Sequence, residues 1–477
     1  MSTPSLPSDR RFHLLAMPLA LIGLAIGVLL ISFDPVTIAR RTSTASISRD
    51  GPELLARPVP LTVSFAPEEL AAVRSLSPLP AVAEDPTNRL ALDPRAGWLG
   101  QSLFFDPRLS GTGEVHCATC HDPARWFVDG LPVARSIGVG TRNTPTLLHV
   151  AHHRWFGWDG RADSLWSMSL LPIENESEMG GNRVAVVRLV ASDPSLRRMY
   201  ESIFGELPPI EGGRRRGLNL PPNARPVPED PQSPMNVAWE SMSESTRDTV
   251  NRIYANVGKS LAAYQSMLSD GSAPIDRFIK GLNEAGTETT SPLSPEEARG
   301  LLLFVGKAGC IRCHSGPLLT DEEFHNIGVP PREGRMPRDP GRYAGIDLVK
   351  SSPFNAAGPF SDGRESARGI ITDALVNSPE HWGRFKTPSL RNVSKTPPYM
   401  HAGQFETLEQ VVRFYSTLEG AVQLDHHQET VLEPLNLTEE EIRDLVAFLN
   451  ALHGIGPPDE LMGPPRRPFG GSVGEGS

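Results

Sequence analysis

Two short cysteine motifs have the residue types and spacing for covalent attachment of a cofactor. The pattern Cys-x-x-Cys-His occurs twice, as Cys117, Cys120 and His121 and again as Cys310, Cys313 and His314. Two thiols at this spacing add to the two vinyl groups of one haem, and the adjacent histidine then reaches the haem iron. The two motifs use all four cysteines in the chain. The sequence therefore predicts two covalently bound haem c groups, one per motif.

The alternatives for these cysteines are a pair of disulfides or a Cys/His zinc site. Structural zinc takes four ligands, so each cysteine pair would need two further ligands grouped with it. In both motifs a histidine follows the second cysteine directly, where a haem ligand belongs. We therefore favour haem over zinc.

Composition bounds the size of the fold and the class of partner. The 477 residues are 39% hydrophobic and 21% charged, which is typical of a globular protein with two or three domains. A net charge of -10 argues against nucleic acid as a partner, because phosphate binding requires a basic surface. The 46 prolines and 43 glycines predict much irregular structure.

The N-terminus carries a membrane or export signal. The uncharged run Leu14–Phe33 is long enough to span a bilayer as a helix, and it follows Arg10 and Arg11. A cleaved signal peptide usually has a shorter apolar run and a small-residue cleavage site. We therefore predict an uncleaved anchor over residues 1–33, followed by a linker over residues 34–62. Because c-type haem is attached outside the cytoplasmic membrane, the body should face the periplasm, held at the inner membrane.

The rest of the chain is predicted to form helices joined by long loops. Helical periodicity over 246–269, 408–418 and 438–452 and a helix start at Ser294, with Pro295 and Glu297 completing a capping box, predict the main elements. The fold class is mainly α, with two cytochrome c-like haem domains in one chain plus the N-terminal transmembrane helix. The predicted segments are an N-terminal domain over 63–285, a C-terminal domain over 286–456 and a disordered tail over 457–477.

Several further motifs follow one another along the chain. They are Leu103–Ser110 (LFFDPRLS), Arg142–Thr146 (RNTPT), Trp158–Arg161 (WDGR), Phe385–Asn392 (FKTPSLRN) and Pro398–His401 (PYMH). In this order they resemble the bacterial diheme cytochrome c peroxidase and MauG superfamily over about residues 90–455. The residues of 154–166 and the long loop region 321–382 look most like the MauG-type enzymes of methanobactin operons.

The resemblance implies that the first haem, on His121, reacts with hydrogen peroxide and that the second haem, on His314, stores or relays the electron. Peroxidases of the family carry a histidine in the loop after the first motif that caps the reactive iron. Val139 occupies the matching position here. The resemblance thus implies an open, five-coordinate first haem, as in MauG.

The second axial ligand of the second haem separates the subfamilies. Peroxidases have a methionine fourteen residues after the histidine of the Pro-Tyr-x-His motif, whereas MauG has a tyrosine. Tyr415 lies fourteen residues after His401, and Met400 is a rival ligand nearby. A phenolate would favour ferric and higher oxidation states, whereas a thioether raises the reduction potential. Tyr415 could also simply be a core residue of its helix.

Three further positions match catalytic residues of the family. Trp158 corresponds to the tryptophan between the two haems, a relay for electrons, and would otherwise be a core aromatic. Glu178 corresponds to a distal carboxylate that moves a proton as the peroxide bond breaks, and would otherwise be a solvated acid. Pro172 corresponds to a distal proline. The chain departs from the family at Met168, where glutamine is common, and at Ala402, where aspartate is usual.

The family also implies a calcium ion between the domains. Asn143 and the backbone carbonyls of Thr396 and Pro398 match its ligands, and oxygen ligands suit a hard cation. Other histidines find no partner in these motifs and are interpreted as surface or core residues; they are His149, His152, His153, His426 and His427.

Three functions follow from this interpretation. The first is a peroxide-activated diheme oxidoreductase that oxidises a partner protein through the second haem, in the manner of MauG. The second is a diheme cytochrome c peroxidase that detoxifies hydrogen peroxide with electrons from a small cytochrome or cupredoxin. The third, a non-catalytic electron-transfer cytochrome, is disfavoured by the open first haem, since simple carriers keep both axial positions filled.

Overall fold

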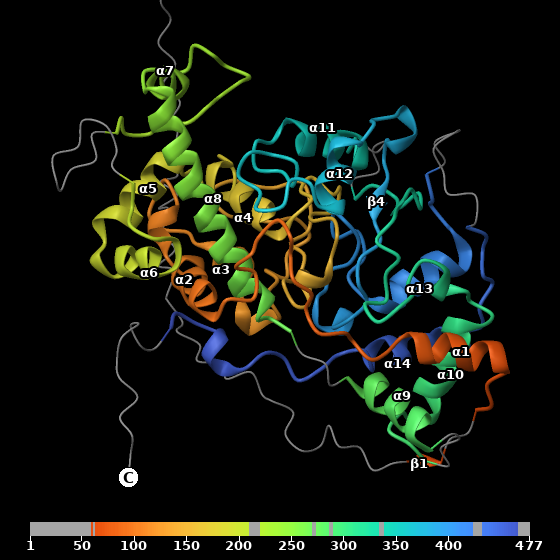
Figure 1. Ribbon diagram of the computed structural model, residues 1–477. Helices are drawn as coiled ribbons and strands as arrows, with labels where there is room; N and C mark the ends of the chain where they lie inside the picture. Colours follow the sequence, from red (N-terminus) through yellow and green to blue (C-terminus); the bar gives the residue numbers. More distant parts are fainter. Residues whose placement is uncertain are drawn as a thin grey trace, which may run out of the picture. The chain divides into compact units, whose positions relative to one another are not determined.

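The computed structural model describes residues 59–60, 63–208, 220–269, 273–285, 290–332, 338–422 and 432–465, all within the compact unit 46–477 (Figure 1). None of the helices in these ranges has the length and apolarity to cross a bilayer. The predicted anchor, Leu14–Phe33, and most of the linker lie outside them.

The fold is mainly helical, as the sequence predicts. Its α-helices are α1 (Pro67–Ser75), α2 (Pro94–Phe104), α3 (Cys117–Cys120), α4 (Leu165–Glu174), α5 (Arg183–Ser192), α6 (Pro194–Phe204), α7 (Pro234–Glu240), α8 (Glu244–Ser266), α9 (Pro274–Ala285), α10 (Pro295–Val305), α11 (Arg342–Ser351), α12 (Ala367–Asp373), α13 (Leu408–Thr417) and α14 (Glu439–Asn450). Two-residue strands form two antiparallel pairs, β1 (Val59–Pro60) with β2 (Thr290–Ser291) and β3 (Phe324–His325) with β4 (Phe385–Lys386). Short 3-10 turns are η2 (Pro107–Leu109), η3 (Pro123–Arg125), η4 (Val150–His152), η5 (Cys310–Arg312), η6 (Pro379–His381), η7 (Val393–Lys395) and η8 (Asp459–Leu461).

The first hydrophobic core surrounds α8, the longest described helix. α2 and α4 both pack along it, and α5 and α6 complete the cluster. The backbones of α2 and α8 approach so closely at Gly100 that an added Cβ would lie 1.9 Å from the Ser260 carbonyl oxygen. Glycine at this crossing therefore lets the two helices meet and fixes the segment that leads to Cys117.

The second core is built on the crossing of α10 and α14. Ser294 caps α10, with Pro295 in its first turn and Glu297 completing the capping box, which confirms the predicted helix start. At the crossing, a Cβ on Gly300 would lie 2.0 Å from the Asp444 carbonyl oxygen. The Asp444 carboxylate accepts two hydrogen bonds from the Arg299 guanidinium, each 2.8 Å long. The packing of α10 against α14 thus fixes the position of the second cysteine motif, which follows α10 in the chain.

Replacing Gly300 with alanine should destabilise the second core by about 1–3 kcal/mol, because the methyl group can be accommodated only if α10 and α14 move apart. Thermal unfolding followed by circular dichroism of the holoprotein measures the effect. Gly463→Ala is the control, since a Cβ there meets nothing within 4 Å. Equal melting temperatures for the two variants would show that the crossing is not tightly packed.

The two cores do not follow the predicted boundary at residues 285 and 286. α1 and α9 belong to the second core, where Val73, Leu76 and Phe278 are fully buried. Phe354 and Phe360, from the long region 321–382, pack instead into the first core. Periodicity identifies the apolar face of a helix, but it does not tell which of two cores covers that face.

The predicted disordered tail also begins too early. Residues 457–465 are described, and Leu461 is buried in the first core. Two side chains of the first core bind its backbone, with Tyr264 Oη donating to the Leu461 carbonyl oxygen at 2.6 Å and Gln101 Nε2 to that of Glu460 at 2.6 Å. Composition predicted disorder because it does not show that a single apolar residue is buried or that the backbone oxygens beside it accept hydrogen bonds. Residues 466–477 lie outside the described part.

Candidate functional site

His121 is positioned by the turn that follows the first cysteine motif. Its Nδ1 lies 3.1 Å from the backbone carbonyl oxygen of Phe127, and Phe127 adopts a left-handed conformation that aims this carbonyl. A hydrogen bond at Nδ1 leaves Nε2 as the nitrogen that can ligate a metal. Burial lowers the pKa of His121, which keeps the imidazole neutral, as a ligand must be.

His314 repeats this arrangement in the second motif. Its Nδ1 lies 3.0 Å from the backbone carbonyl oxygen of Leu319, and burial again lowers the pKa of the imidazole. Gly309 precedes the motif with φ +61°, in the left-handed region, and starts the turn η5. In both histidines, Nε2 is thus the nitrogen that can ligate a metal.

The cysteines also fit haem attachment. All four lie in the described part of the chain, and no disulfide joins them. Burial raises the pKa of Cys117 and of Cys310 to about 12, so both thiols lie in a desolvated environment. Cys313 lies within 4.8 Å of ligand atoms of Asp321 and His325, but a sulfur committed to a thioether is not available to a metal ion there.

Glu178 lies close to the first motif. Burial raises the pKa values of Cys117 and Cys120, and the charge of Glu178 raises them further. Burial also raises the pKa of Glu178 itself. Asn175 Nδ2 donates a hydrogen bond of 2.7 Å to Glu178 Oε1, which fixes the carboxyl group. A carboxyl group whose pKa is raised and whose orientation is fixed is a candidate for proton transfer.

The segment after the first motif forms a small hairpin against Glu178. Arg135 and Val139 form a β-bridge, and Gly138 N–H donates to the Ser177 carbonyl oxygen at 2.8 Å. The Val139 side chain is 61% exposed. Pro172 lies inside α4, near the end of that helix. The structure thus gathers Glu178 and the Val139 segment near the first motif.

Tyr415 projects from α13 toward the second motif. Burial raises the pKa of its phenol, and the charges of Cys310 and Cys313 raise that pKa further, so the hydroxyl lies near both sulfurs. Thr407 caps α13 with a capping box, which sets the rotation of the helix. No contact places Met400 at this motif among the described residues.

Trp158 lies where the two halves of the chain meet. Its Nε1 donates a 2.9 Å hydrogen bond to the Asn143 carbonyl oxygen, and its own carbonyl oxygen accepts one of 2.8 Å from the Lys386 N–H. The next residue, Asp159, is fully buried between the guanidinium groups of Arg142 and Arg161, at 2.6 and 2.9 Å. These bonds hold the turn that carries the indole.

The expected calcium ligands are brought into one region. Asn143 N–H donates to the His401 carbonyl oxygen at 2.8 Å, which joins its loop to the loop that holds Thr396 and Pro398. The Asn143 side chain is buried, and its Nδ2 donates to the Leu131 carbonyl oxygen at 2.8 Å. This bond uses the Asn143 side-chain nitrogen and leaves its side-chain oxygen as the atom that could ligate a cation.

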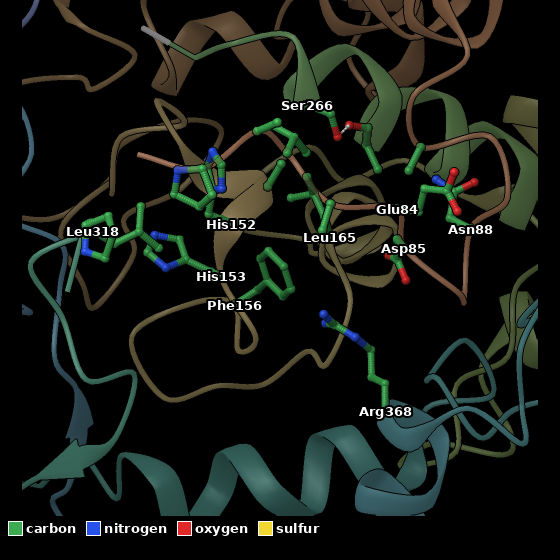
Figure 2. A pocket seen from close by; sticks show the side chains of 18 of the residues that line it. Glu84, Asp85, Asn88, His152, His153, Phe156, Leu165, Ser266, Leu318 and Arg368 are labelled. Atoms are coloured by element: carbon green, nitrogen blue, oxygen red, sulfur yellow. Dashed lines mark hydrogen bonds between the residues drawn. The ribbon is translucent and has the colours of Figure 1, made fainter. Parts of the chain in front are cut away.

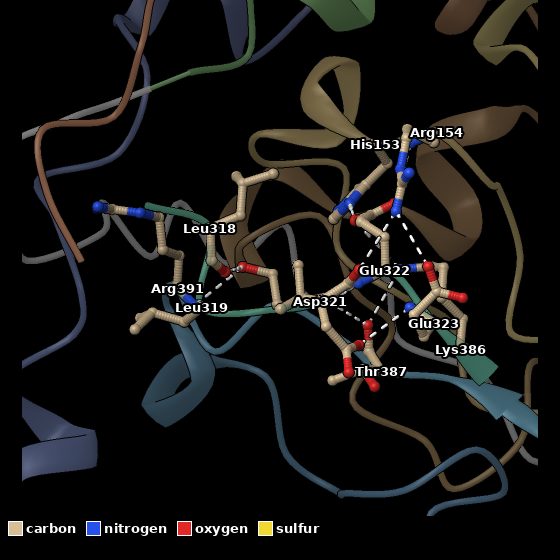
Figure 3. A network of polar contacts seen from close by, with 12 residues as sticks. His153, Arg154, Leu318, Leu319, Asp321, Glu322, Glu323, Lys386, Thr387 and Arg391 are labelled. Atoms are coloured by element: carbon tan, nitrogen blue, oxygen red, sulfur yellow. Dashed lines mark hydrogen bonds and ion pairs between the residues drawn. The ribbon is translucent and has the colours of Figure 1, made fainter. Parts of the chain in front are cut away.

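A buried ionic network that the sequence did not predict lies beside these residues (Figure 3). The carboxylate of Glu322 binds His153 Nδ1 and accepts a 2.9 Å hydrogen bond from Arg154 N–H, and Lys386 Nζ lies 3.9 Å away. These contacts lower the pKa of Glu322 to about 2 despite its burial. Within the acidic run Asp321–Glu323, no local signal marks the middle residue as the buried one.

A cavity of about 370 Å³ marks the same junction from another side (Figure 2). Its walls come from the 80–91 loop, α8 and the segment directly after His314. His152 lies in this wall with a buried Nε2 that has no hydrogen-bond partner among the described residues. Burial and the neighbouring histidines lower the pKa of His152 to about 4, so the ring is neutral.

The mainly helical fold with two histidine-bearing cysteine motifs defines a c-type cytochrome with two haem sites. A family profile described as di-haem cytochrome c peroxidase matches residues 95–284. Cytochrome-c peroxidase IdrP2 of Denitromonas iodatirespirans is 33% identical over 75% of this chain and 81% of its own length. Methylamine utilization protein MauG of Methylorubrum extorquens is 32% identical over 82% of this chain and 87% of its own.

The chain belongs to the di-haem cytochrome c peroxidase and MauG family, and it is thus a member of a family of hydrogen peroxide-dependent oxidoreductases. The fold agrees with the crystal structure of a MauG-like protein associated with microbial copper homeostasis, with a TM-score of 0.54 and 24% identity over 81% of this chain and 97% of that one. The resemblance predicted from the motifs is confirmed.

Proposed function

We propose that this protein is a periplasmic, MauG-type enzyme that uses hydrogen peroxide to oxidise a partner protein. The observation that supports this choice most is the phenol of Tyr415 beside Cys310 and Cys313, where the second haem would carry its sixth ligand. A conventional peroxidase remains the second candidate, because relatives at about 30% identity carry the name cytochrome-c peroxidase. The periplasmic location rests on where c-type haem is attached.

The haems, when bound to His121 and His314, supply the iron that reacts with peroxide and the second redox centre that shares the oxidising equivalents. The chain's own residues hold them and handle protons. Glu178 takes a proton from one peroxide oxygen and returns it to the other, which requires the ionised form at the start. Asn175 keeps the carboxylate in place for both transfers. Pro172 limits the space on the same side.

Trp158 is assigned the relay between the two redox centres. Its indole Nε1 is bound to the Asn143 carbonyl oxygen and its backbone carbonyl to the Lys386 N–H, so the ring cannot shift without breaking the bond to Asn143. The Asp159 ion pairs keep the positive guanidinium groups neutralised beside the ring. Calcium, held by Asn143 with the carbonyls of Thr396 and Pro398, would stiffen the same junction.

The Tyr415→Met variant should still bind two haems, but the reduction potential and the absorption spectrum of the second haem should change. A thioether raises the reduction potential relative to a phenolate, so the second haem should become easier to reduce. In the unaltered protein, peroxide alone should produce a near-infrared charge-resonance band without prior reduction, and the variant should lose it. Absorption spectra from the visible to the near infrared measure both effects.

Tyr399→Phe provides the matched control, since Tyr399 is another tyrosine packed against the second core. Two haems per chain in the pyridine haemochrome assay would show that each variant is fully loaded. If the unaltered protein reacts with peroxide only after reduction of one haem, or if the Tyr415 variant keeps its spectrum, the conventional peroxidase is the better assignment.

A further inference from the structure

The backbone that orients His314 has an uncommon conformation. Leu319, whose carbonyl oxygen lies 3.0 Å from His314 Nδ1, has φ +56°, and Glu322, three residues later, has φ +63°. Both values lie in the left-handed region, which residues other than glycine seldom adopt. Such conformations persist only where the surrounding contacts hold them in place. The contacts of residues 319–322 therefore determine where the acceptor for His314 lies.

One side of this segment is held from the second half of the chain. The Leu319 side chain is buried in the second core. Thr320 Oγ1 donates to the Thr387 carbonyl oxygen at 2.7 Å and accepts from the Glu322 N–H at 3.0 Å. Ser389 Oγ donates to the Leu318 carbonyl oxygen at 2.6 Å. These bonds fix the backbone around Leu319 on the side of residues 387–389.

The buried side chain of Glu322 joins the same segment to the first half of the chain (Figure 3). Its Oε1 binds His153 Nδ1, and its Oε2 accepts a 2.9 Å hydrogen bond from the Arg154 N–H. An ionised carboxylate can only accept hydrogen bonds, so His153 Nδ1 carries the proton that it donates. The two carboxylate oxygens thus bind two donors from adjacent residues of the first half.

Lys386 connects this carboxylate to the Trp158 turn. Its Nζ lies 3.9 Å from Glu322 Oε1, and its backbone N–H donates to the Trp158 carbonyl oxygen at 2.8 Å. Both charged side chains are buried, so the ammonium group depends on the carboxylate for its countercharge. Glu322 therefore lies between the segment that orients His314 and the turn that carries the relay tryptophan.

This arrangement acts on the reduction potential of the second haem in two ways. A hydrogen bond at Nδ1 makes the imidazole a stronger donor to iron, which favours the ferric state. Without its anchor, the Leu319 carbonyl oxygen is held less firmly and the bond to His314 weakens. Loss of the carboxylate also leaves the positive charge of Lys386 uncompensated, which disfavours the more positive ferric state. Both effects raise the potential.

We infer that Glu322 is a positioning residue for the second haem. It holds the Leu319 carbonyl oxygen on His314 Nδ1 through contacts with the first half of the chain, and so keeps the reduction potential of that haem low. Glu322 itself touches neither iron nor substrate in this role. The inference rests on the two haem sites of the family, so it applies to a MauG-type enzyme and to a conventional peroxidase alike.

Glu322→Gln tests this role, because a single amide oxygen can accept from His153 or from the Arg154 N–H but not from both. In the holoprotein without peroxide, the ratio of ferrous to ferric second haem at a fixed potential should rise by about tenfold, which is about 59 mV for a one-electron couple. Spectroelectrochemical titration measures both haems, and the first should keep its potential. Glu323→Gln is the matched control, since it removes the same charge from a neighbouring side chain that is 66% exposed.

Two further measurements separate positioning from charge. The double variant Glu322→Gln with Lys386→Met removes one charge of each sign, so a pure charge effect should cancel, whereas a displaced carbonyl oxygen leaves the potential raised. The EPR g-values of the ferric second haem, which depend on the bond between His314 and iron, should also shift in both variants. A change in stability alone would move the melting temperature and leave these g-values in place.

His153→Leu removes a donor of the first half without altering residues 314–322, and it should raise the potential of the second haem in the same direction. It decides the question by the same readouts if Glu322→Gln fails to bind two haems. Equal second-haem potentials in Glu322→Gln and Glu323→Gln, equal shifts at both haems, an unaltered potential in His153→Leu, or a return to the original potential in the double variant would each overturn the inference. None of these measurements uses peroxide or a partner protein, so failure of the proposed function would not change their outcome.

Discussion

Glu178→Gln is expected to slow the reaction with hydrogen peroxide by about 10²–10⁴-fold, the usual contribution of a positioned acid–base group. Glutamine keeps the shape of the side chain and the hydrogen bond from Asn175, but it cannot take up the proton. Stopped-flow spectroscopy of the haem absorption on mixing with peroxide measures the rate. Binding of both haems should be unaffected, because the substitution leaves the cysteines and the two proximal histidines in place.

The pKa of Glu178 also predicts in which direction the rate of the peroxide reaction changes with pH. Burial raises the pKa of Glu178 above that of an exposed glutamate, so its carboxylate is lost as the pH falls through the raised value. The rate should therefore fall toward acid pH, and the Glu178→Gln variant should lose that dependence. Glu176→Gln is the control, since the side chain of Glu176 is 76% exposed and pairs with Arg225. Similar rates for both variants would exclude Glu178 from proton transfer.

Trp158→Phe is expected to slow oxidation of a protein donor by about 100-fold, which is about 2.7 kcal/mol of activation free energy, while peroxide still reacts with the first haem. A phenyl ring is much harder to oxidise than an indole, so charge sharing between the two redox centres should stop. The measurement compares two rates in one protein, the haem absorption change on adding peroxide and the oxidation of a reduced small cytochrome.

The substitution also removes the hydrogen bond from Nε1 to the Asn143 carbonyl oxygen, so packing must be separated from electron relay. Trp98→Phe is the matched control, because Trp98 is a 43% exposed indole on α2. Melting temperatures of both variants report any loss of packing. Unaltered donor oxidation in the Trp158→Phe variant, with normal stability, would show that electrons take another route.

The sequence predicted the parts of this protein that local chemistry determines. The spacing within a Cys-x-x-Cys-His motif is enough to predict haem attachment. The capping residues of α10 and α13 make hydrogen bonds within one helical turn, so they too can be recognised from a short stretch of sequence. Family motifs located Trp158, Glu178 and Tyr415. The structure places Glu178 near the first motif, Tyr415 near the second and Trp158 at the junction of the halves. Their chemical roles remain predictions that the variants above test.

The remaining features depend on contacts between distant parts of the chain. Glu322 adopts a left-handed conformation, φ +63°, and is buried only because His153 and Lys386 arrive from elsewhere. Leu461 is held by burial in the first core and by the hydrogen bond that its carbonyl oxygen accepts from Tyr264. Neither tertiary partner is visible in a local pattern, so composition and periodicity could not reveal these contacts.

The return of residues 457–465 to the first core has a mechanical consequence. Along the described residues, the chain passes from the second core at α1 to the first and goes back to the second at α9. It then enters the first core at Phe354 and Phe360, the second at α13 and finally the first again at Leu461. The polypeptide therefore connects the two cores at several points, so no single linker can act as a hinge between them. Proteolytic cleavage at any one of these connections should leave the two cores associated. The distance between the two haem sites on either side of Trp158 should therefore vary less with thermal motion than in a protein whose domains share one linker.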